Sequence, residues 1–274
     1  MKAKLQDFLK EDLGTGDVTS ALVVPEDARA KGKIICKEDC LLAGIEEVTM
    51  VFSELGAKVV SAKEDGSRAT KGDVVMEVEG SARSLLAGER LALNIMMRMS
   101  GIATLTEGLA KRCRQINPGV RVAATRKTTP GFRRFEKKAV AVGGGDPHRM
   151  GLYDAILIKN NHIRLSGGVV EALRRARPGS FTKKVEVEVE NLEDARSAAE
   201  NGVDIIMLDN FGPEEALSVS KELRKIRPDI LIEISGGINP DNIEKYAAAA
   251  DIISLGWLTH SFKSVDFSMK IEPA

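Results

Sequence analysis

The sequence predicts an α/β protein: an N-terminal α+β sandwich domain at residues 1–103, a parallel β/α barrel at 104–260, and a tail at 261–274 that joins the first domain. Two observations predict this class. From about Arg121 onward, six short apolar runs with polar or glycine ends alternate with helical segments, which is typical of βαβ units. One of these runs alternates valine with glutamate, and this favours a barrel over a doubly wound sheet.

The first third combines strands with two helices. The stretches "ARAKGKIICKEDCLLAG" and "AKVVSAKEDGSRATKGDVVMEVEG" read as strands with turns at "EDG" and "KGD", and a helix is expected between them from about Ile45 to Leu55. A long helix follows over residues 82–113, because leucine, isoleucine and methionine recur there at three and four residues. The tail is too short for another βα unit, so we expect it to fold back on the first domain.

The six predicted barrel strands are "RVAAT", "AILI", "VEVEVE", "DIIMLD", "ILIEIS" and "DIISLG". The helices between them carry start and stop signals. Asn191 is a predicted N-cap with Asp194 three residues on, and Gly202 ends that segment. Pro213 stands near the start of the next helix, where a missing N–H does no harm.

The run "KKVEVEVEN" separates two faces of one strand. Side chains alternate along a strand, so Val185, Val187 and Val189 share one face and Glu186, Glu188 and Glu190 share the other. Both faces of a doubly wound sheet are covered by helices and would bury the glutamates, whereas a barrel offers a polar inner face near its strand ends. An edge strand with a wet face is the alternative for this stretch alone.

Composition limits the kind of partner. The 274 residues carry 40 basic and 40 acidic side chains, so no overall field attracts nucleic acid or an anionic membrane. No apolar run approaches the roughly 20 residues of a membrane span, and the charged opening "MKAKLQDFLKEDLG" does not resemble a signal peptide. We expect a cytoplasmic protein whose three cysteines, Cys36, Cys40 and Cys113, are reduced thiols.

The predicted strand ends collect charged side chains. In a parallel barrel the carboxyl ends of the strands meet at one face, so residues from "TRKTTPG", "GGGDPHR", "KNNH", "EVEN" and "LDN" should converge. This places Glu188 and Asp209 among five basic groups, namely Arg126, Lys127, His148, Arg149 and Lys159. Like charges held together are unfavourable without a counter-charge, so the cluster indicates a polyanionic ligand.

The last two strand ends are typical of a phosphate site. Gly236, Gly237 and Gly256 would let backbone N–H groups approach a phosphate, with a helix N-terminus expected after "SGGINP". Glu188 and Asp209 could hold ribose hydroxyls or bind Mg²⁺ through waters, or serve only as counter-ions of the cations. We expect Glu186 and Glu190 to be structural.

The stretch from Ala124 to Ile163, "ATRKTTPGFRRFEKKAVAVGGGDPHRMGLYDAILIKNNHI", resembles the signature of the quinolinate phosphoribosyltransferase family. "EDLGTGDVTS", "ERLALN…SGIAT", "EVEVEN", "LDN", "EISGGI" and "SLGWLTHS" follow in family order, so the resemblance spans nearly the whole chain. One departure is Asn160, because the family usually has Lys-Asp-Asn-His where this chain has "KNNH".

The resemblance implies a fold and an activity. The fold is an open, incomplete β/α barrel of the type II phosphoribosyltransferase kind. The activity is transfer of the phosphoribosyl group of 5-phosphoribosyl 1-pyrophosphate to quinolinate with decarboxylation, which gives nicotinate mononucleotide, pyrophosphate and CO2 in NAD biosynthesis. The resemblance also implies Mg²⁺ and a homodimer that can assemble further into a hexamer, with Arg90 reaching the neighbouring active site.

Site residues carried over from the family fall into three groups. The catalytic residues are Lys127, Lys159, Glu188 and Asp209, and the last two are also the metal carboxylates. The substrate-binding residues are these four together with Arg90, Thr125, Arg126, His148, Arg149, Ser235, Gly236, Gly237, Gly256 and His260.

Other functions compete with this interpretation. A related protein of molybdenum transport usually lacks the lysine at the position of Lys159, and a nicotinate phosphoribosyltransferase would need fewer cations. Lys159 could instead form a Schiff base, as in an aldolase. The stretch "TRKTTPGFRRFEKK" could be a nucleic-acid patch, although the net charge and the few aromatic residues argue against that.

Overall fold

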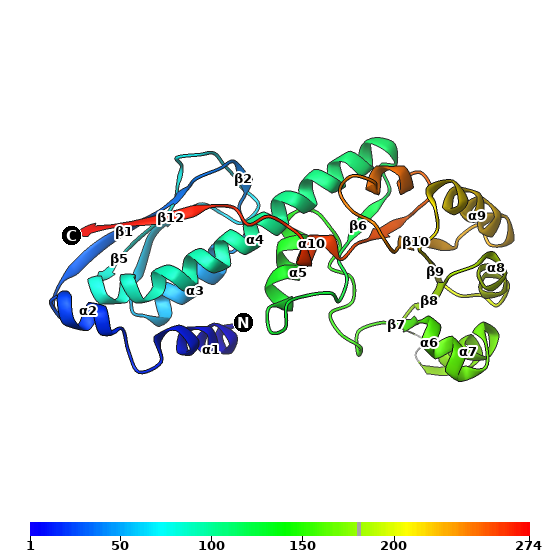
Figure 1. The fold of residues 1–274 in the computed structure, drawn as a ribbon, viewed down its shortest axis with the longest axis horizontal. Helices are drawn as coiled ribbons and strands as arrows, with labels where there is room; N and C mark the ends of the chain where they lie inside the picture. The colour runs from blue at the N-terminus through cyan, green and yellow to red at the C-terminus, as the bar shows by residue number, and fades with distance from the viewer. Residues whose placement is uncertain (180–181) are drawn as a thin grey trace. The chain divides into compact units, whose positions relative to one another are not determined.

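Figure 1 shows the computed structural model of the chain, which describes residues 1–179 and 182–274. The chain forms two compact units. The first consists of Met1–Glu107, Pro130–Gly144 and Phe262–Ala274, and the second of Gly108–Thr129 and Gly145–Ser261. The predicted boundaries at residues 1–103 and 104–260 differ from these units chiefly in the segment 130–144, which packs with the first unit.

The segment 130–144 is held in the first unit by charge and by aromatic rings. Glu136 is fully buried and pairs with Arg98 at 2.5 Å. Phe132 and Phe135 stack with centroids 4.6 Å apart, and Phe8 lies within 5.8 Å of both rings. A buried carboxylate needs such a partner, so this ion pair ties helix α5 to the first unit.

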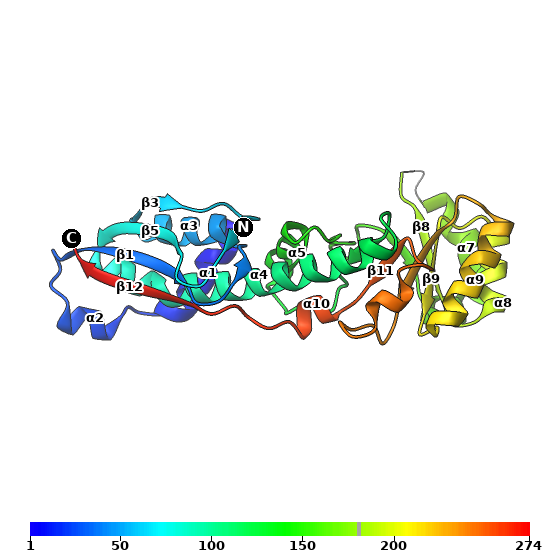
Figure 2. The same ribbon diagram turned by 90° about the horizontal axis from the view of Figure 1, so that it is seen from above.

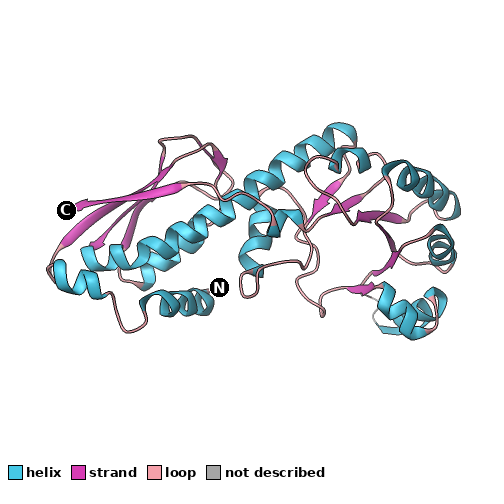
Figure 3. Cartoon of the chain, viewed as in Figure 1, coloured by secondary structure: helices cyan, strands magenta, loops and turns pink. Residues whose placement is uncertain are grey.

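The first unit is an antiparallel sheet with helices on one side of it (Figures 1 and 3). The sheet order is β12-β1-β5-β3, so the tail folds back as predicted and pairs with β1. β1 alternates exposed and buried residues, and Gly32 lies where a Cβ would come within 3.3 Å of Leu85 on α4. The elements are α1 Lys2–Leu13, α2 Val18–Val23, β1 Arg29–Cys36, β2 Cys40–Leu41, α3 Ile45–Glu54, β3 Lys58–Ala62, β4 Arg68–Ala69, β5 Val74–Ser81, α4 Ala82–Ile116, α5 Arg133–Val142 and β12 Phe267–Pro273. The last turns of α4, residues 108–116, belong to the second unit.

The second unit contains a six-stranded parallel sheet in the order β6-β11-β10-β9-β8-β7. Neighbours follow chain order around the sheet, but β6 and β7 do not pair, so the barrel is open as expected. Helices α7, α8 and α9 lie along one side of the strands (Figures 1 and 2). The elements are β6 Arg121–Ala123, β7 Ile156–Ile158, α6 Asn160–Ser166, α7 Val169–Ala176, η1 Arg177–Gly179, β8 Val185–Val189, α8 Leu192–Glu200, β9 Ile205–Asp209, α9 Pro213–Ile226, β10 Leu231–Ser235, η2 Ile243–Tyr246, β11 Ile252–Ser254 and α10 Trp257–His260.

The predicted local signals occur where expected. The Asn191 side chain accepts a hydrogen bond from the Asp194 N–H at 2.8 Å and caps α8, and Pro213 is the first residue of α9. All five residues of β8 are buried, including Glu186 and Glu188, while Glu190 is exposed. In the described residues, no helix has the length and apolar character that a membrane crossing requires.

Candidate active site

A cavity of about 560 Å³ opens at the carboxyl ends of the strands in the second unit. Its wall is formed by residues in or directly after each of the six strands, together with the loop that follows Gly145. The predicted site residues that line it are Thr125, Arg126, Lys127, His148, Arg149, Lys159, Glu188, Asp209, Ser235, Gly236, Gly237, Gly256 and His260. Arg90, the remaining predicted residue, is an exposed residue of α4 in the first unit and is not among the residues that line this cavity.

Two arginines form the inner cationic part of the cavity. Arg149 is buried, and its burial lowers its pKa, as does the nearby Arg126 guanidinium. In the described part of the chain, the buried Arg126 Nε has no hydrogen-bond partner. A buried donor without a partner is unfavourable by about 1–3 kcal/mol, so this pair of arginines is suited to an anion that neutralises both.

Lys127 is positioned by its own backbone. Its N–H donates to Thr125 Oγ1 at 3.0 Å, and its carbonyl accepts from Thr259 Oγ1 at 2.8 Å. The side chain itself is exposed at the mouth of the cavity, next to His260. A fixed backbone with a free side chain suits a lysine that contacts a ligand.

Two acidic residues at strand ends, Glu188 and Asp209, lie near Lys159. Lys159 forms an ion pair with Glu188 across β7 and β8, and Asp209 follows on β9. Burial and the neighbouring Glu188 raise the pKa of Asp209, whose carboxylate also accepts a hydrogen bond from Asn210 Nδ2 at 2.8 Å. Two carboxylates that repel each other in a shared cavity fit a hard divalent cation, because oxygen donors are what Mg²⁺ prefers.

Two glycines of the last two strand ends, Gly236 and Gly256, leave no room for a side chain. A Cβ on Gly236 would lie 2.3 Å from Asn210 Oδ1, and one on Gly256 would lie 2.7 Å from His260 Nε2. The predicted helix after "SGGINP" is instead the four-residue 3₁₀ helix η2. The reason is that Asn242 Oδ1 accepts from the Asn239 N–H and Asn239 Oδ1 from the Asp241 N–H, and such local turns compete with a helix.

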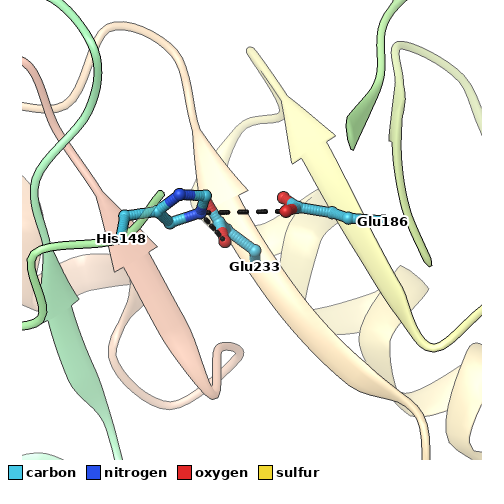
Figure 4. A group of neighbouring side chains, drawn as sticks. All are labelled: His148, Glu186 and Glu233. Carbon is cyan, nitrogen blue, oxygen red and sulfur yellow. Dashed lines mark hydrogen bonds and ion pairs between the residues drawn. The ribbon is translucent and has the colours of Figure 1, made fainter. Parts of the chain in front are cut away.

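One buried residue of the cavity wall, Glu233, was not predicted from the sequence. His148 Nε2 lies 3.2 Å from Glu233 Oε2 and 3.8 Å from Glu186 Oε2, as Figure 4 shows. Burial raises the pKa of Glu186, and repulsion from the Glu233 carboxylate adds to the shift. Glu233 alternates with two isoleucines in "ILIEIS", the same signal as in "VEVEVE", so its inward position could have been predicted.

The three polar atoms around the imidazole define its tautomer. His148 Nδ1 accepts a hydrogen bond from the Arg149 backbone N–H at 2.8 Å, so Nδ1 carries no proton. A neutral imidazole then carries its proton on Nε2 and donates it to Glu233 Oε2. Glu186 Oε2 lies 3.8 Å from Nε2, which is beyond hydrogen-bond distance.

An open parallel barrel with a cationic, glycine-edged cavity at its strand ends defines an α/β enzyme of the class that acts on phosphorylated, multiply charged substrates. The family model of the quinolinate phosphoribosyl transferase N-terminal domain matches residues 17–100, and the family model of the C-terminal domain matches residues 102–270. The chain belongs to the quinolinate phosphoribosyl transferase family, and the family predicted from its motifs is confirmed.

Relatives from distant organisms cover nearly the whole chain. A probable nicotinate-nucleotide pyrophosphorylase (carboxylating) of Methanocaldococcus jannaschii is 49% identical over 97% of this chain and 95% of its own length. The nicotinate-nucleotide pyrophosphorylase (carboxylating) of Homo sapiens is 38% identical over 99% of this chain and 91% of its own length. The crystal structure of NadC from Streptococcus pyogenes superposes with a TM-score of 0.92 at 41% identity, covering 99% of this chain and 96% of that one.

Proposed function

We propose that this chain transfers the phosphoribosyl group of 5-phosphoribosyl 1-pyrophosphate to quinolinate and decarboxylates the product, giving nicotinate mononucleotide, pyrophosphate and CO2. The observation that carries the proposal is the cavity itself, where four cationic side chains, Arg126, Lys127, Arg149 and Lys159, face a glycine edge. A diacid and a sugar with a phosphate and a pyrophosphate bring enough negative charge to neutralise them. The names of the relatives support the same activity.

The arginines bind the pyridine dicarboxylate in this proposal. Arg126 and Arg149 are close enough for their charges to interact, so two adjacent ring carboxylates can bridge them through bidentate hydrogen bonds. Arg90 of a second copy of the chain would complete the clamp, which requires a homodimer. Holding the ring in this way directs its nitrogen toward the anomeric carbon of the sugar.

The lysines stabilise the leaving group. Lys127 and Lys159 lie at the mouth of the cavity, where they can neutralise charge that develops on the departing pyrophosphate. Glu188 and Asp209 would hold Mg²⁺, which supplies further positive charge there when it is bound. Gly236, Gly237 and Gly256 would hold the 5-phosphate through backbone N–H groups.

The decarboxylation follows from the first step. Once the ring nitrogen is bonded to the ribose it is cationic, so the bond from ring carbon 2 to its carboxylate can break with the electron pair left on that carbon. CO2 leaves, and a proton from the solvent completes the ring. The protein needs no further electron sink.

Three free thiols support a cytoplasmic location for the reaction, because disulfides are rare there.

The test is incubation with quinolinate, 5-phosphoribosyl 1-pyrophosphate and Mg²⁺, with nicotinate mononucleotide and CO2 assayed together. Equal amounts of both products are expected, and EDTA should abolish turnover until Mg²⁺ is restored. Product formed from nicotinate without CO2 would instead support a phosphoribosyltransferase that does not decarboxylate. No product from either acid would refute the proposal.

A further inference from the structure

Two clusters in the described residues bring three potential metal ligands together. In the first unit, Glu46, Glu47 and Asp65 surround Lys138, whose Nζ lies 2.6–3.2 Å from the nearest oxygen of each carboxylate. The ammonium occupies the place that a cation would take. This cluster is therefore a complete ion-pair network.

The second cluster is different because it consists of one histidine, His148, and two buried glutamates, Glu186 and Glu233. A metal does not suit it, since His148 Nδ1 already accepts the Arg149 N–H and the proton of the neutral ring must then be on Nε2. A protonated Nε2 has no lone pair to offer a metal ion. The same proton is available as a hydrogen-bond donor to Glu233 Oε2.

His148 adopts an unfavourable backbone conformation and is held in it at three points. Its φ is 53°, and in the described chain only Asn210 shares this region among residues other than glycine. Its N–H donates to Asp146 Oδ1 at 2.7 Å, its Nε2 to Glu233, and its Nδ1 accepts from Arg149. Glu233 is the anchor from a distant part of the chain, since it belongs to β10.

We propose that Glu233 is a positioning residue for the dicarboxylate part of the active site, acting through the His148 ring on the backbone of Arg149. The Glu233 carboxylate holds the ring by accepting a hydrogen bond from His148 Nε2. The ring in turn holds the backbone nitrogen of Arg149, whose N–H donates to His148 Nδ1. Glu233 is fully buried and sits on a central strand of the sheet, so this anchor is rigid. The inference rests on the proposed function, which places one substrate carboxylate on the Arg149 guanidinium.

The effect should be selective for one substrate. Without Glu233 the ring can rotate, and the Arg149 N–H loses its acceptor, so the guanidinium is no longer directed at the diacid. A misplacement of about 1 Å can reduce the rate up to about 100-fold, so we expect the KM for quinolinate to rise by roughly 10-fold or more. The KM for 5-phosphoribosyl 1-pyrophosphate should change less than about 2-fold, because the glycine edge and the lysines remain in place.

Two substitutions separate positioning from simple burial. Glu233→Gln keeps a carbonyl oxygen that can accept the Nε2 proton and turns its amide toward Glu186, so the KM for quinolinate should stay near that of the unchanged protein. Glu233→Leu keeps the volume and removes the acceptor, so it should show the selective rise. Glu190→Gln, at an exposed carboxylate directly after β8, is the control and should leave the KM for quinolinate unchanged.

A double-mutant cycle shows whether the effect passes through Arg149. If it does, Glu233→Leu should add little to the loss already caused by Arg149→Lys, so the two effects should be far from additive. Nitrogen NMR of the ring supplies a readout without turnover, since the chain has three histidines. His148 should show a protonated Nε2 in the unchanged protein and in Glu233→Gln, and this tautomer should no longer be fixed in Glu233→Leu.

Several results would overturn the inference: additive losses in the cycle, an equal rise in both KM values, a protonated Nδ1 in the unchanged protein, or a Glu233→Gln variant as impaired as Glu233→Leu. These are distinct from failure of the proposed function. That failure would appear in the unchanged protein, as no nicotinate mononucleotide from quinolinate.

Discussion

Adding one methyl group at Gly256 should damage the cavity without damaging the fold. The backbone of Gly256 has φ −71° and ψ −18°, which alanine adopts without strain. A Cβ there would lie 2.7 Å from His260 Nε2 and 2.9 Å from Lys127 Cδ, whereas ordinary contacts begin at 3.4 Å. The two side chains must therefore retreat by about 0.5–0.7 Å, the difference between these distances.

The expected loss of rate follows from this displacement. If a displacement of 1 Å at a catalytic group reduces the rate about 100-fold, Gly256→Ala should reduce kcat/KM for 5-phosphoribosyl 1-pyrophosphate by about 10-fold, or about 1.4 kcal/mol. The assay varies this substrate at saturating quinolinate and records Tm in parallel. Gly212→Ala is the matched control, because Gly212 has φ −68° and nothing lies within 4 Å of a Cβ there.

The two variants should behave differently. Gly212→Ala should keep activity with at most a small loss of Tm, because Gly212 is the N-cap of α9 and alanine caps a helix less well than glycine. Gly256→Ala should lose activity at a nearly unchanged Tm, because the side chains that must move are exposed. An unchanged kcat/KM in Gly256→Ala would refute the steric argument. So would an equal loss in the control.

Three further predictions concern assembly, capping and pH. Mixing inactive Arg90→Ala and Lys159→Ala chains should restore about a quarter of full activity, because half of randomly formed dimers are hybrids with one intact shared site; no recovery despite demonstrated subunit exchange would exclude sharing. Asn191→Ala removes the cap of α8 and should lower stability by about 1 kcal/mol and Tm by about 2–4 °C at unchanged KM, and a change in KM would show that the cap serves the site. Because the native pKa of Glu186 is raised above 4.5, its stabilising protonated state is lost as pH rises, so the free energy of unfolding should decline above about pH 5. Glu186→Gln should flatten that decline in denaturant titrations from pH 5 to 9, and an equal slope in both proteins would contradict the assignment.

Local signals predicted most of the fold because they act over a few residues. The alternation in "VEVEVE", the cap at Asn191 and the proline at 213 each specify backbone conformation where they stand, and each appears in the structure. The rule that parallel strands end at one face then placed ten site residues around one cavity, and the family resemblance added Thr125, Ser235 and His260.

Tertiary contacts decided what local signals could not. Residues 130–144 follow a barrel strand, yet they pack in the first unit because the Arg98–Glu136 ion pair and the rings around Phe132 are there. Glu233 meets His148 across 85 residues, and nothing near either one specifies that contact. The longer helix expected after "SGGINP" does not form, because the side chains of Asn239 and Asn242 make local turns there. The hydrogen bonds of these turns depend on side-chain geometry, which composition does not give.

The pairing of β12 with β1 has a consequence for biosynthesis. β1 ends at Cys36 and β12 begins at Phe267. One edge of β1 therefore stays unpaired while the ribosome makes the intervening residues. At about 5–20 residues per second, this delay is on the order of ten to fifty seconds. During that time the nascent chain exposes an unpaired strand edge to other nascent chains, and alternate lysines in "RAKGKIIC" are the kind of charge that discourages such pairing.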